Sequence, residues 1–243
     1  MSPAAPPRRA EEAAVGRFPA PWHLTGRAYV FALRFPRQEL KTSRFVPQQQ
    51  ANSLRCPLSI VMFVDYYNAD CGPYQELLFI PGSFEFDAGR FLSISVIYVS
   101  TMVSVVNGRA NWGIPKRRCD FEVLRRSFGE RIRATLDGRT FAEFEVEPGV
   151  HSLPVRSGLL PARLRSFAQR SGRREYRYAP RARARIARAK VQRLHGDGSL
   201  FPDLASARLV MAMHLEWFEM IFPVANVAAL KALDVAKEKA RAS

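Results

Sequence analysis

The chain has 243 residues, of which 47% are hydrophobic, 24% charged and 11% aromatic. These proportions are ordinary for a globular protein with a hydrophobic core, and they exclude a mostly disordered chain, a collagen and a coiled coil. The charge is unusual, because 37 Lys and Arg residues outnumber 22 Asp and Glu residues and give a formal net charge of +15. Such an excess is typical of proteins that bind nucleic acids or anionic membranes, so its position along the chain matters.

Most of the positive charge lies in one segment. Residues 161–195 hold twelve basic side chains and one acid, Glu175, whereas the rest of the chain has a net charge of only +4. Arg181, Arg183 and Arg185 alternate with small residues, which favours a strand with one basic face, although an alanine-rich helix also fits. No nucleic-acid-binding motif accompanies the segment. We therefore expect no nucleic-acid partner and keep a basic nucleic-acid-binding protein only as an alternative.

Cysteine and histidine positions indicate neither a disulfide framework nor a metal site. The three cysteines are an odd number without paired spacing, and the four histidines are scattered. No apolar run reaches the ~18 residues of a membrane span, and the N-terminus lacks the apolar stretch of a signal peptide. These features predict a cytoplasmic protein without a metal and without a membrane partner.

In chain order, residues 1–18 predict a disordered tail, and residues 19–243 predict a single domain. Strand signals then dominate, with β-branched and aromatic residues in alternation. Strands are predicted over Arg27–Phe35, Ser59–Tyr67, Tyr74–Ile80, Phe91–Ser100, Arg131–Leu136 and Thr140–Val146, with the turn Asp137-Gly138 between the last two.

Helix signals are fewer. Ser100 is a candidate cap for a short helix over Thr101–Asn107 that Gly108 would end. Val224–Ala240 has apolar residues at helical spacing and predicts a helix, while the apolar segment Ala205–Phe222 fits either a helix or a strand. Many antiparallel strands with a few flanking helices predict an α+β protein, mainly antiparallel β, folded as a closed or nearly closed β-barrel.

One motif pair carries chemical information. Residues 108–118 read GRANWGIPKRR, residues 72–76 read GPYQE and residues 79–82 read FIPG. Together, and over most of the chain from about Trp22 onward, they resemble the acetoacetate decarboxylase family. The resemblance implies that family's β-barrel and a lyase that acts on a small keto acid without a cofactor. It also implies a homo-oligomer.

The resemblance implies that Lys116 forms a Schiff base with the substrate ketone. A lysine amine attacks a carbonyl only when neutral, and at its ordinary pKa of ~10.4 well under 1% is neutral at pH 7. An apolar pocket and a nearby cation both favour the neutral amine. Arginine cannot substitute for it, because guanidinium does not deprotonate in proteins. Lys116 is the one lysine among the 23 basic residues between Thr42 and Ala189.

Further roles follow from matching positions. Glu76 matches the family's acidic residue in G-x-Y-x-E, which implies proton transfer to the enamine or a hydrogen bond to the substrate. Strand alternation puts Glu76 on one face with Leu78 and Ile80. Arg34 matches the family's pocket arginine, which implies that it holds the substrate carboxylate.

Two positions depart from the family pattern. The decarboxylases carry a second lysine directly after the nucleophile, where this chain has Arg117, so Arg117 and Arg118 are the candidates for perturbing the pKa of the amine. On a strand, Arg118 would share the side of Lys116. The decarboxylases also have a further carboxylate that would fall within residues 59–62, where this chain reads SIVM. Relatives of this fold perform aldol and dehydration chemistry through the same lysine. The reaction therefore stays open between decarboxylation and aldol or dehydration chemistry, with a non-catalytic small-ligand-binding protein as the alternative.

Overall fold

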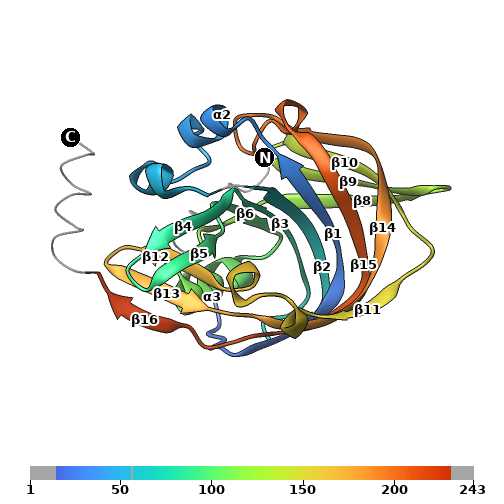
Figure 1. Ribbon diagram of the computed structural model, residues 1–243. Coiled ribbons are helices and arrows are strands. Elements are labelled where there is room, and N and C mark those ends of the chain that lie inside the picture. The colour runs from blue at the N-terminus through green and yellow to red at the C-terminus, as the bar shows by residue number, and fades with distance from the viewer. Residues whose placement is uncertain (1–14, 56, 231–243) are drawn as a thin grey trace, which may run out of the picture.

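The computed structural model describes residues 15–55 and 57–230, and two sheets make up most of it (Figure 1). The strands of the large sheet are β1 (Trp22–Arg34), β2 (Ser59–Ala69), β3 (Tyr74–Ile80), β6 (Val96–Val99), β7 (Lys116–Arg118), β8 (Asp120–Arg126), β9 (Gly129–Leu136), β10 (Arg139–Pro148), β11 (Leu153–Arg156), β14 (Arg181–Gly196) and β15 (Arg208–Phe222). Those of the small sheet are β4 (Gly82–Phe86), β5 (Gly89–Ser93), β12 (Phe167–Ser171), β13 (Arg174–Tyr178) and β16 (Asn226–Ala229). The helices are α2 (Arg37–Thr42), α3 (Met102–Trp112) and the 3₁₀ turns η1 (Gln48–Ser53), η2 (Ser157–Leu159), η3 (Ala162–Leu164) and η4 (Leu204–Ser206).

The large sheet is mostly antiparallel and curves into a nearly closed barrel. Its strands follow the order β7-β6-β3-β2-β1-β15-β14-β10-β9-β8, with β11 paired to β14. The small sheet has the order β16-β13-β12-β5-β4. Helix α3 packs against β6 and β7 of the large sheet and against β13 of the small one (Figure 1). The predicted fold class, mainly antiparallel β with a few helices, is confirmed.

Alternation along β1, β2 and β3 produces two separate cores, because successive side chains point to opposite faces. Phe31, Val61 and Phe79 lie in register on one face and belong to what we call the first core. The opposite face carries what we call the second core, which packs against α3 and includes Val64 and Leu78. The strands therefore read as nearly continuous apolar runs, as expected of strands buried on both faces.

One predicted strand is divided in the structure because tertiary pairing overrides the local pattern. Residues 91–100 alternate without interruption, yet β5 ends at Ser93 and β6 begins at Val96. Ser93 pairs with Gly82 in the small sheet, whereas Val96 pairs with Phe79 in the large one. In the segment over residues 205–222, which fitted either a helix or a strand, residues 208–222 form the strand β15, and residues 205 and 206 belong to η4.

The prediction of a helix over Val224–Ala240 is wrong for its first part. Residues 226–229 form β16, which pairs with the edge strand β13. A free strand edge offers unpaired backbone groups, and this pairing outweighs a weak helix propensity. The remainder, residues 231–240, lies outside the described residues.

The chain is already attached to α3 at Gly16 and Phe18, within the predicted tail. Asn107 on α3 donates from Nδ2 to the carbonyl of Gly16 at 2.9 Å and accepts the N–H of Phe18 on Oδ1 at 2.7 Å. The tail predicted over residues 1–18 therefore includes a short attached segment, and residues 1–14 lie outside the described part of the chain.

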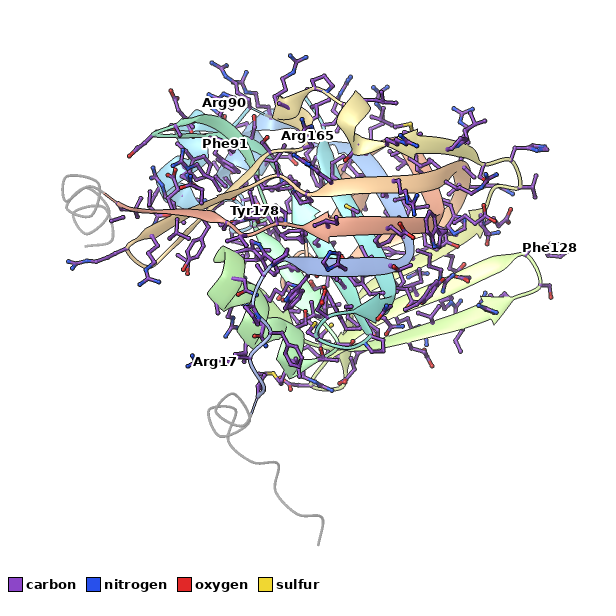
Figure 2. The ribbon with its side chains drawn as sticks, turned by 90° about the horizontal axis from the view of Figure 1, so that it is seen from below. Arg17, Arg90, Phe91, Phe128, Arg165 and Tyr178 are labelled. Carbon is purple, nitrogen blue, oxygen red and sulfur yellow. The ribbon has the colours of Figure 1, made fainter. Side chains whose placement is uncertain are left out.

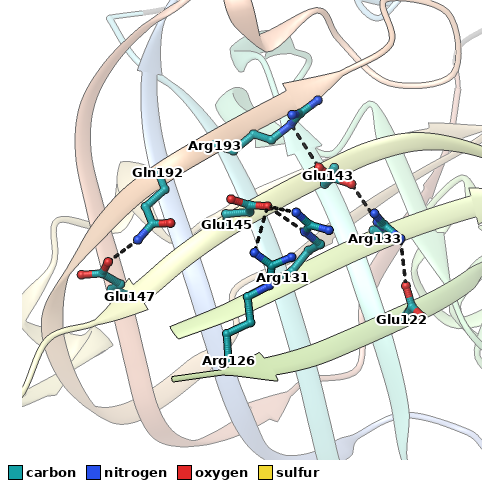
Figure 3. A network of polar contacts seen from close by, with 9 residues as sticks. All are labelled: Glu122, Arg126, Arg131, Arg133, Glu143, Glu145, Glu147, Gln192 and Arg193. Atoms are coloured by element: carbon teal, nitrogen blue, oxygen red, sulfur yellow. Dashed lines mark hydrogen bonds and ion pairs between the residues drawn. The ribbon is translucent and has the colours of Figure 1, made fainter. Parts of the chain in front are cut away.

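Part of the basic segment faces glutamates of the neighbouring strands. It contains β14, so the strand interpretation of its alternating arginines is confirmed. Arg183 donates to Glu219 of β15 at 2.6 Å, and Arg193 lies 3.1 Å from Glu143 of β10. Figure 3 shows how this pairing continues across β10, β9 and β8, where glutamates alternate with arginines. Local pairing of this kind leaves fewer guanidinium groups to bind phosphate.

Within the described ranges, no helix is both long and apolar enough to span a membrane.

Candidate active site

The first part of the site is a pair of neighbouring strands, β2 and β3. Tyr74 and Glu76 lie on the face of β3 that joins the second core, and Tyr66 on β2 lies directly opposite Tyr74 in the register. The predicted alternation is confirmed, because Glu76, Leu78 and Ile80 are all buried on this face. A carboxylate that is 4% exposed among apolar side chains requires a charged or hydrogen-bonding partner.

The partner of Glu76 is Lys116, which is positioned by a tight connection between α3 and β7. Gly113 ends α3 in the left-handed region, with φ 64°, and its N–H bonds to the carbonyl of Arg109 at 3.0 Å. The N–H of Lys116 then bonds to the carbonyl of Ile114 at 2.8 Å across Pro115, which is a γ-turn. Proline favours this turn because its ring fixes φ near −65°. Lys116 thus begins β7, and the parallel register with β6 pairs it with Ile97 of the second core.

Three acceptors surround the Lys116 amine, which is enough for the three N–H bonds of an ammonium group. Nζ lies 2.9 Å from Glu76 Oε2 and 2.9 Å from Ser104 Oγ. The hydroxyl of Tyr74 is 3.5 Å from Nζ, and its ring centroid is 4.9 Å away, within the range of a cation–π contact. Lys116 as a whole is only 3% exposed.

Gly108 leaves the space through which the lysine side chain passes. A Cβ atom on Gly108 would lie 2.6 Å from Cδ and 2.8 Å from Cε of Lys116. The prediction that Gly108 ends the helix is therefore wrong, because α3 runs from Met102 to Trp112 and the glycine lies inside it. Thr101, rather than Ser100, caps the helix by accepting the N–H of Ser104 at 3.3 Å. Ser104 and Gly108 are one turn apart and share the face that touches Lys116.

Two tyrosines support the carboxylate. Tyr66 donates its hydroxyl to Glu76 Oε1 at 3.3 Å, and the rings of Tyr66 and Tyr74 are 4.5 Å apart. Burial raises the pKa of both phenols well above its ordinary value, and the charge of Glu76 raises it further. Both tyrosines therefore stay protonated and act as hydrogen-bond donors at neutral pH.

The Lys116–Glu76 pair faces a cavity of about 150 Å³, which we call the lysine cavity. A cavity of this volume holds a ligand of about six non-hydrogen atoms. Its polar members are Tyr66, Tyr74, Glu76 and Lys116, and its other walls are mostly aromatic and aliphatic. Among the apolar residues are Trp22, Met62, Ile97, Trp112, Phe167 and Phe222. An apolar pocket with a few convergent polar groups is the usual form of a small-molecule site.

The three predicted arginines lie away from this cavity. Arg34 is exposed at the end of β1, where it pairs in register with Arg208. Arg118 is exposed and bonds to Asp120 at 2.6 Å. Arg117 lies beside Tyr98 of the first core, where burial raises the pKa of the phenol and the guanidinium opposes that rise. The structure thus brings together Lys116 and Glu76 but none of these arginines.

Sequence reasoning did not identify Ser104 or Tyr66. Helical spacing carries a signal for Ser104, which precedes Gly108 by four residues. The signal for Tyr66 is the register of a β2–β3 hairpin, in which it pairs with the tyrosine of the GPYQE motif. In the part of the chain that the structure describes, no group of three or more His, Cys, Asp and Glu side chains is placed to hold a metal ion.

Solved structures with this fold include several enzymes. An acetoacetate decarboxylase from Legionella pneumophila subsp. pneumophila str. Philadelphia 1 matches with a TM-score of 0.63 at 12% identity, over 94% of this chain and 98% of the other. An acetoacetate decarboxylase-like enzyme from Sphingomonas wittichii RW1 has a TM-score of 0.63 at 10% identity, over 88% and 95%. The enduracididine biosynthesis enzyme MppR, complexed with pyruvate, has a TM-score of 0.59 at 14% identity, over 88% and 92%.

No curated protein matches this sequence. The family model for acetoacetate decarboxylase matches residues 3–200, which is most of the chain and includes the whole of the Lys116–Glu76 pair. With this sequence match and the shared fold, the chain belongs to the acetoacetate decarboxylase family.

Proposed function

We propose that this protein is a Schiff-base-forming lyase that acts on a small keto acid through Lys116. The observation that carries the proposal is the buried amine, 2.9 Å from a buried carboxylate, at the wall of an apolar cavity. A structural ion pair does not need a cavity beside it, and replacing a buried pair by apolar residues is often neutral or stabilising. The empty space next to the amine therefore favours a catalytic role over a purely structural one.

The reaction begins with a proton transfer. Lys116 gives a proton to Glu76, which leaves a neutral amine that can act as a nucleophile and a neutral carboxylic acid. The amine nitrogen attacks the ketone carbon to form a carbinolamine, and loss of water yields an iminium ion. In a β-keto acid, the bond to the carboxylate then breaks, CO₂ leaves, and the bonding electrons neutralise the iminium to form an enamine.

The remaining steps restore the enzyme. Loss of water from the carbinolamine uses the Glu76 proton, so Glu76 is again a carboxylate when the enamine forms. It takes up a proton from solvent and, as the acid on the same side of the cavity as the amine, passes that proton to the enamine carbon. Water then hydrolyses the resulting iminium and releases the ketone and free Lys116. Tyr66 donates to Glu76 and Ser104 accepts from the amine, so these two residues position the reacting groups.

The wall of the cavity bears on which reaction occurs. Residues 59–62 supply no carboxylate, and Met62 occupies the cavity wall on this part of β2. Decarboxylation by this chain would thus rely on one carboxylate, Glu76. MppR binds pyruvate and, in another structure, the condensation product of pyruvate and imidazole 4-carboxaldehyde. Aldol-type chemistry through the same iminium is accordingly the second reaction that we propose to test.

Borohydride trapping tests the proposal. Treatment with sodium borohydride and a panel of 2-keto and 3-keto acids should reduce an iminium and leave a stable mass increment on the peptide that contains Lys116. Lys116→Ala should abolish the adduct, while Lys190→Ala, which removes an exposed lysine on β14, should not. CO₂ release and aldol product, measured on the same panel, assign the reaction. An adduct without turnover would support a non-catalytic binding protein instead, and absence of any adduct would contradict the Schiff-base proposal.

A further inference from the structure

A second cavity adjoins the lysine cavity. It has a volume of about 460 Å³ and is lined by η1, by the turn between β5 and β6, by the end of α3 and by β12. Ile94 and Ile114 line both cavities, so the two spaces are neighbours that share these side chains as a wall. We call this second space the polar cavity, because amide, hydroxyl and guanidinium groups make up much of its wall.

Two buried amide groups in its wall have unmet hydrogen-bond donors. Gln50 is 8% exposed and Gln169 is 4% exposed, and the Nε2 atom of each makes no hydrogen bond among the described residues. Ser93 donates to Oε1 of Gln169 at 3.0 Å, which directs the free Nε2 of that side chain elsewhere. A buried donor without a partner costs about 1–3 kcal/mol, so two of them in one wall indicate a site for an acceptor.

The charged side chains in the wall of the polar cavity also favour an anionic ligand. Arg109 and Arg170 both line the polar cavity, and none of its described lining residues is an Asp or a Glu. Arg170 is held at long ion-pair distances, 3.6 Å from Glu175 and 3.7 Å from Asp87. A cavity with two guanidinium groups and two free amide donors complements an anion that has several acceptor atoms, such as a carboxylate.

Tyr178 connects this wall with the catalytic carboxylate. It lies where the small sheet meets the large one (Figure 2) and stacks on Phe167, which lines the lysine cavity. Burial raises the pKa of its phenol. The Gln169 side chain opposes that rise, and the charge of Glu76 adds to it. Phe167 and Gln169 are two residues apart on β12 and therefore share one face of the strand, so the amide in the polar cavity lies next to a side chain that lines the lysine cavity.

We propose that the substrate is a keto acid with a second carboxylate, which Gln50 and Gln169 bind in the polar cavity while the keto group reaches Lys116. This inference rests on the proposed function for the position of the keto group. The lysine cavity alone accommodates about six non-hydrogen atoms, and its walls offer the distal end of a longer substrate only apolar contacts. Binding energy from a remote group of the substrate can also accelerate the reaction at the other end.

A matched pair of ligands tests the inference. 3-Oxoadipate and 3-oxohexanoate have the same chain length and differ in a distal carboxylate against a methyl group. The measured quantity is the ligand concentration that gives half-maximal borohydride trapping. For the wild-type protein, this concentration should be at least about tenfold lower for 3-oxoadipate than for 3-oxohexanoate. Gln169→Leu and Gln50→Leu should each raise the half-maximal concentration of 3-oxoadipate by about tenfold or more, and should change the half-maximal concentration of 3-oxohexanoate by less than about twofold.

Controls separate this inference from the proposed function. Gln192→Leu removes an exposed glutamine on β14 and should leave both ligands unaffected. Calorimetry on Lys116→Ala, which cannot form an adduct, should still show tighter binding of 3-oxoadipate, and the added Gln169→Leu substitution should remove the difference. Equal binding of the two ligands by Lys116→Ala and by the wild type would overturn the inference. A lack of adduct with both ligands in the wild type would instead count against the proposed function.

Discussion

Replacing Gly108 with alanine tests whether the position of the Lys116 amine is set by the empty space on α3. The new methyl carbon would lie 2.6 Å from Cδ and 2.8 Å from Cε of the lysine, whereas non-bonded carbon atoms prefer about 3.5–4.0 Å. The lysine side chain is more flexible than the helix backbone, so it should move by about 1 Å. Such a movement breaks the 2.9 Å contacts of Nζ with Glu76 and Ser104.

The expected effects on stability and reactivity differ in size. Alanine inside a helix is about 1 kcal/mol more favourable than glycine, and overpacking of a buried site costs about 1–3 kcal/mol. The free energy of unfolding should therefore fall by at most about 2 kcal/mol. A misplacement of 1 Å at a reacting group costs about 10²-fold in rate. Gly108→Ala should thus remain folded and form the Lys116 adduct about a hundredfold more slowly.

The assay is the initial rate of borohydride trapping on the Lys116 peptide by mass spectrometry, with urea unfolding of the same preparation. Gly158→Ala is the matched control, because a Cβ there meets no atom within 4 Å. An unchanged trapping rate in a folded Gly108→Ala protein would refute the argument that this glycine sets the lysine position. A loss of more than about 3 kcal/mol of stability would show that the helix moves instead of the lysine.

Three further predictions concern single side chains around the site and in the barrel. Tyr66→Phe removes the donor to Glu76 Oε1 and should lower kcat by about tenfold while the Lys116 adduct still forms, measured by turnover against trapping. Ser104→Ala removes one of the groups that hold the Lys116 amine in place and should slow trapping by about tenfold, because the amine is then less well oriented toward the substrate. Burial, with a smaller effect of Arg27, lowers the pKa of His214 below its ordinary value. As pH falls, the histidine therefore takes up a proton in the unfolded state before it does so in the folded state. The free energy of unfolding should decrease as pH falls below ~6.5. In urea unfolding between pH 5 and 7.5, His214→Phe should flatten this dependence.

Each of these has a result that would count against it. Equal losses of turnover and trapping in Tyr66→Phe would place the tyrosine in adduct formation rather than in proton transfer. A normal trapping rate in Ser104→Ala would mean that Glu76 alone holds the amine. Glu130 and Glu216 oppose the lowering of the His214 pKa, so an unchanged pH profile in His214→Phe would mean that these acids outweigh burial.

The resemblance of the GPYQE and GRANWGIPKRR motifs to the acetoacetate decarboxylase family pointed to Glu76 and Lys116, and strand alternation placed Glu76 on an apolar face. The structure brings these two side chains to within 2.9 Å of each other. Ser104 and Tyr66 were not identifiable in this way, because their roles depend on the packing of α3 on β7 and on the register of β2 with β3. Arg34 was assigned by position alone, and the end of β1 lies outside both cavities.

The strands of the barrel were predicted more accurately than the residues at which strands begin and end. Apolar and β-branched runs identify β1, β2 and β3 because both of their faces are buried. Alternation over residues 91–100 conceals the break between β5 and β6, where the chain moves from one sheet to the other. The sequence around residues 226–229 favours a helix because alanine and leucine follow them. These residues form a strand because their backbone pairs with β13.

The position of β7 at the end of the large sheet has a consequence for how the Lys116 amine is protected from water. β7 has three residues and one strand neighbour, β6, and its main support on the other side is α3, where Arg109 Nε donates to the carbonyl of Lys116 at 2.9 Å. A short edge strand held by one helix opens more easily than the long central strands. The amide protons of β7 and α3 should therefore exchange together, and the opening free energy of this unit, rather than that of global unfolding, sets how often Lys116 meets bulk solvent.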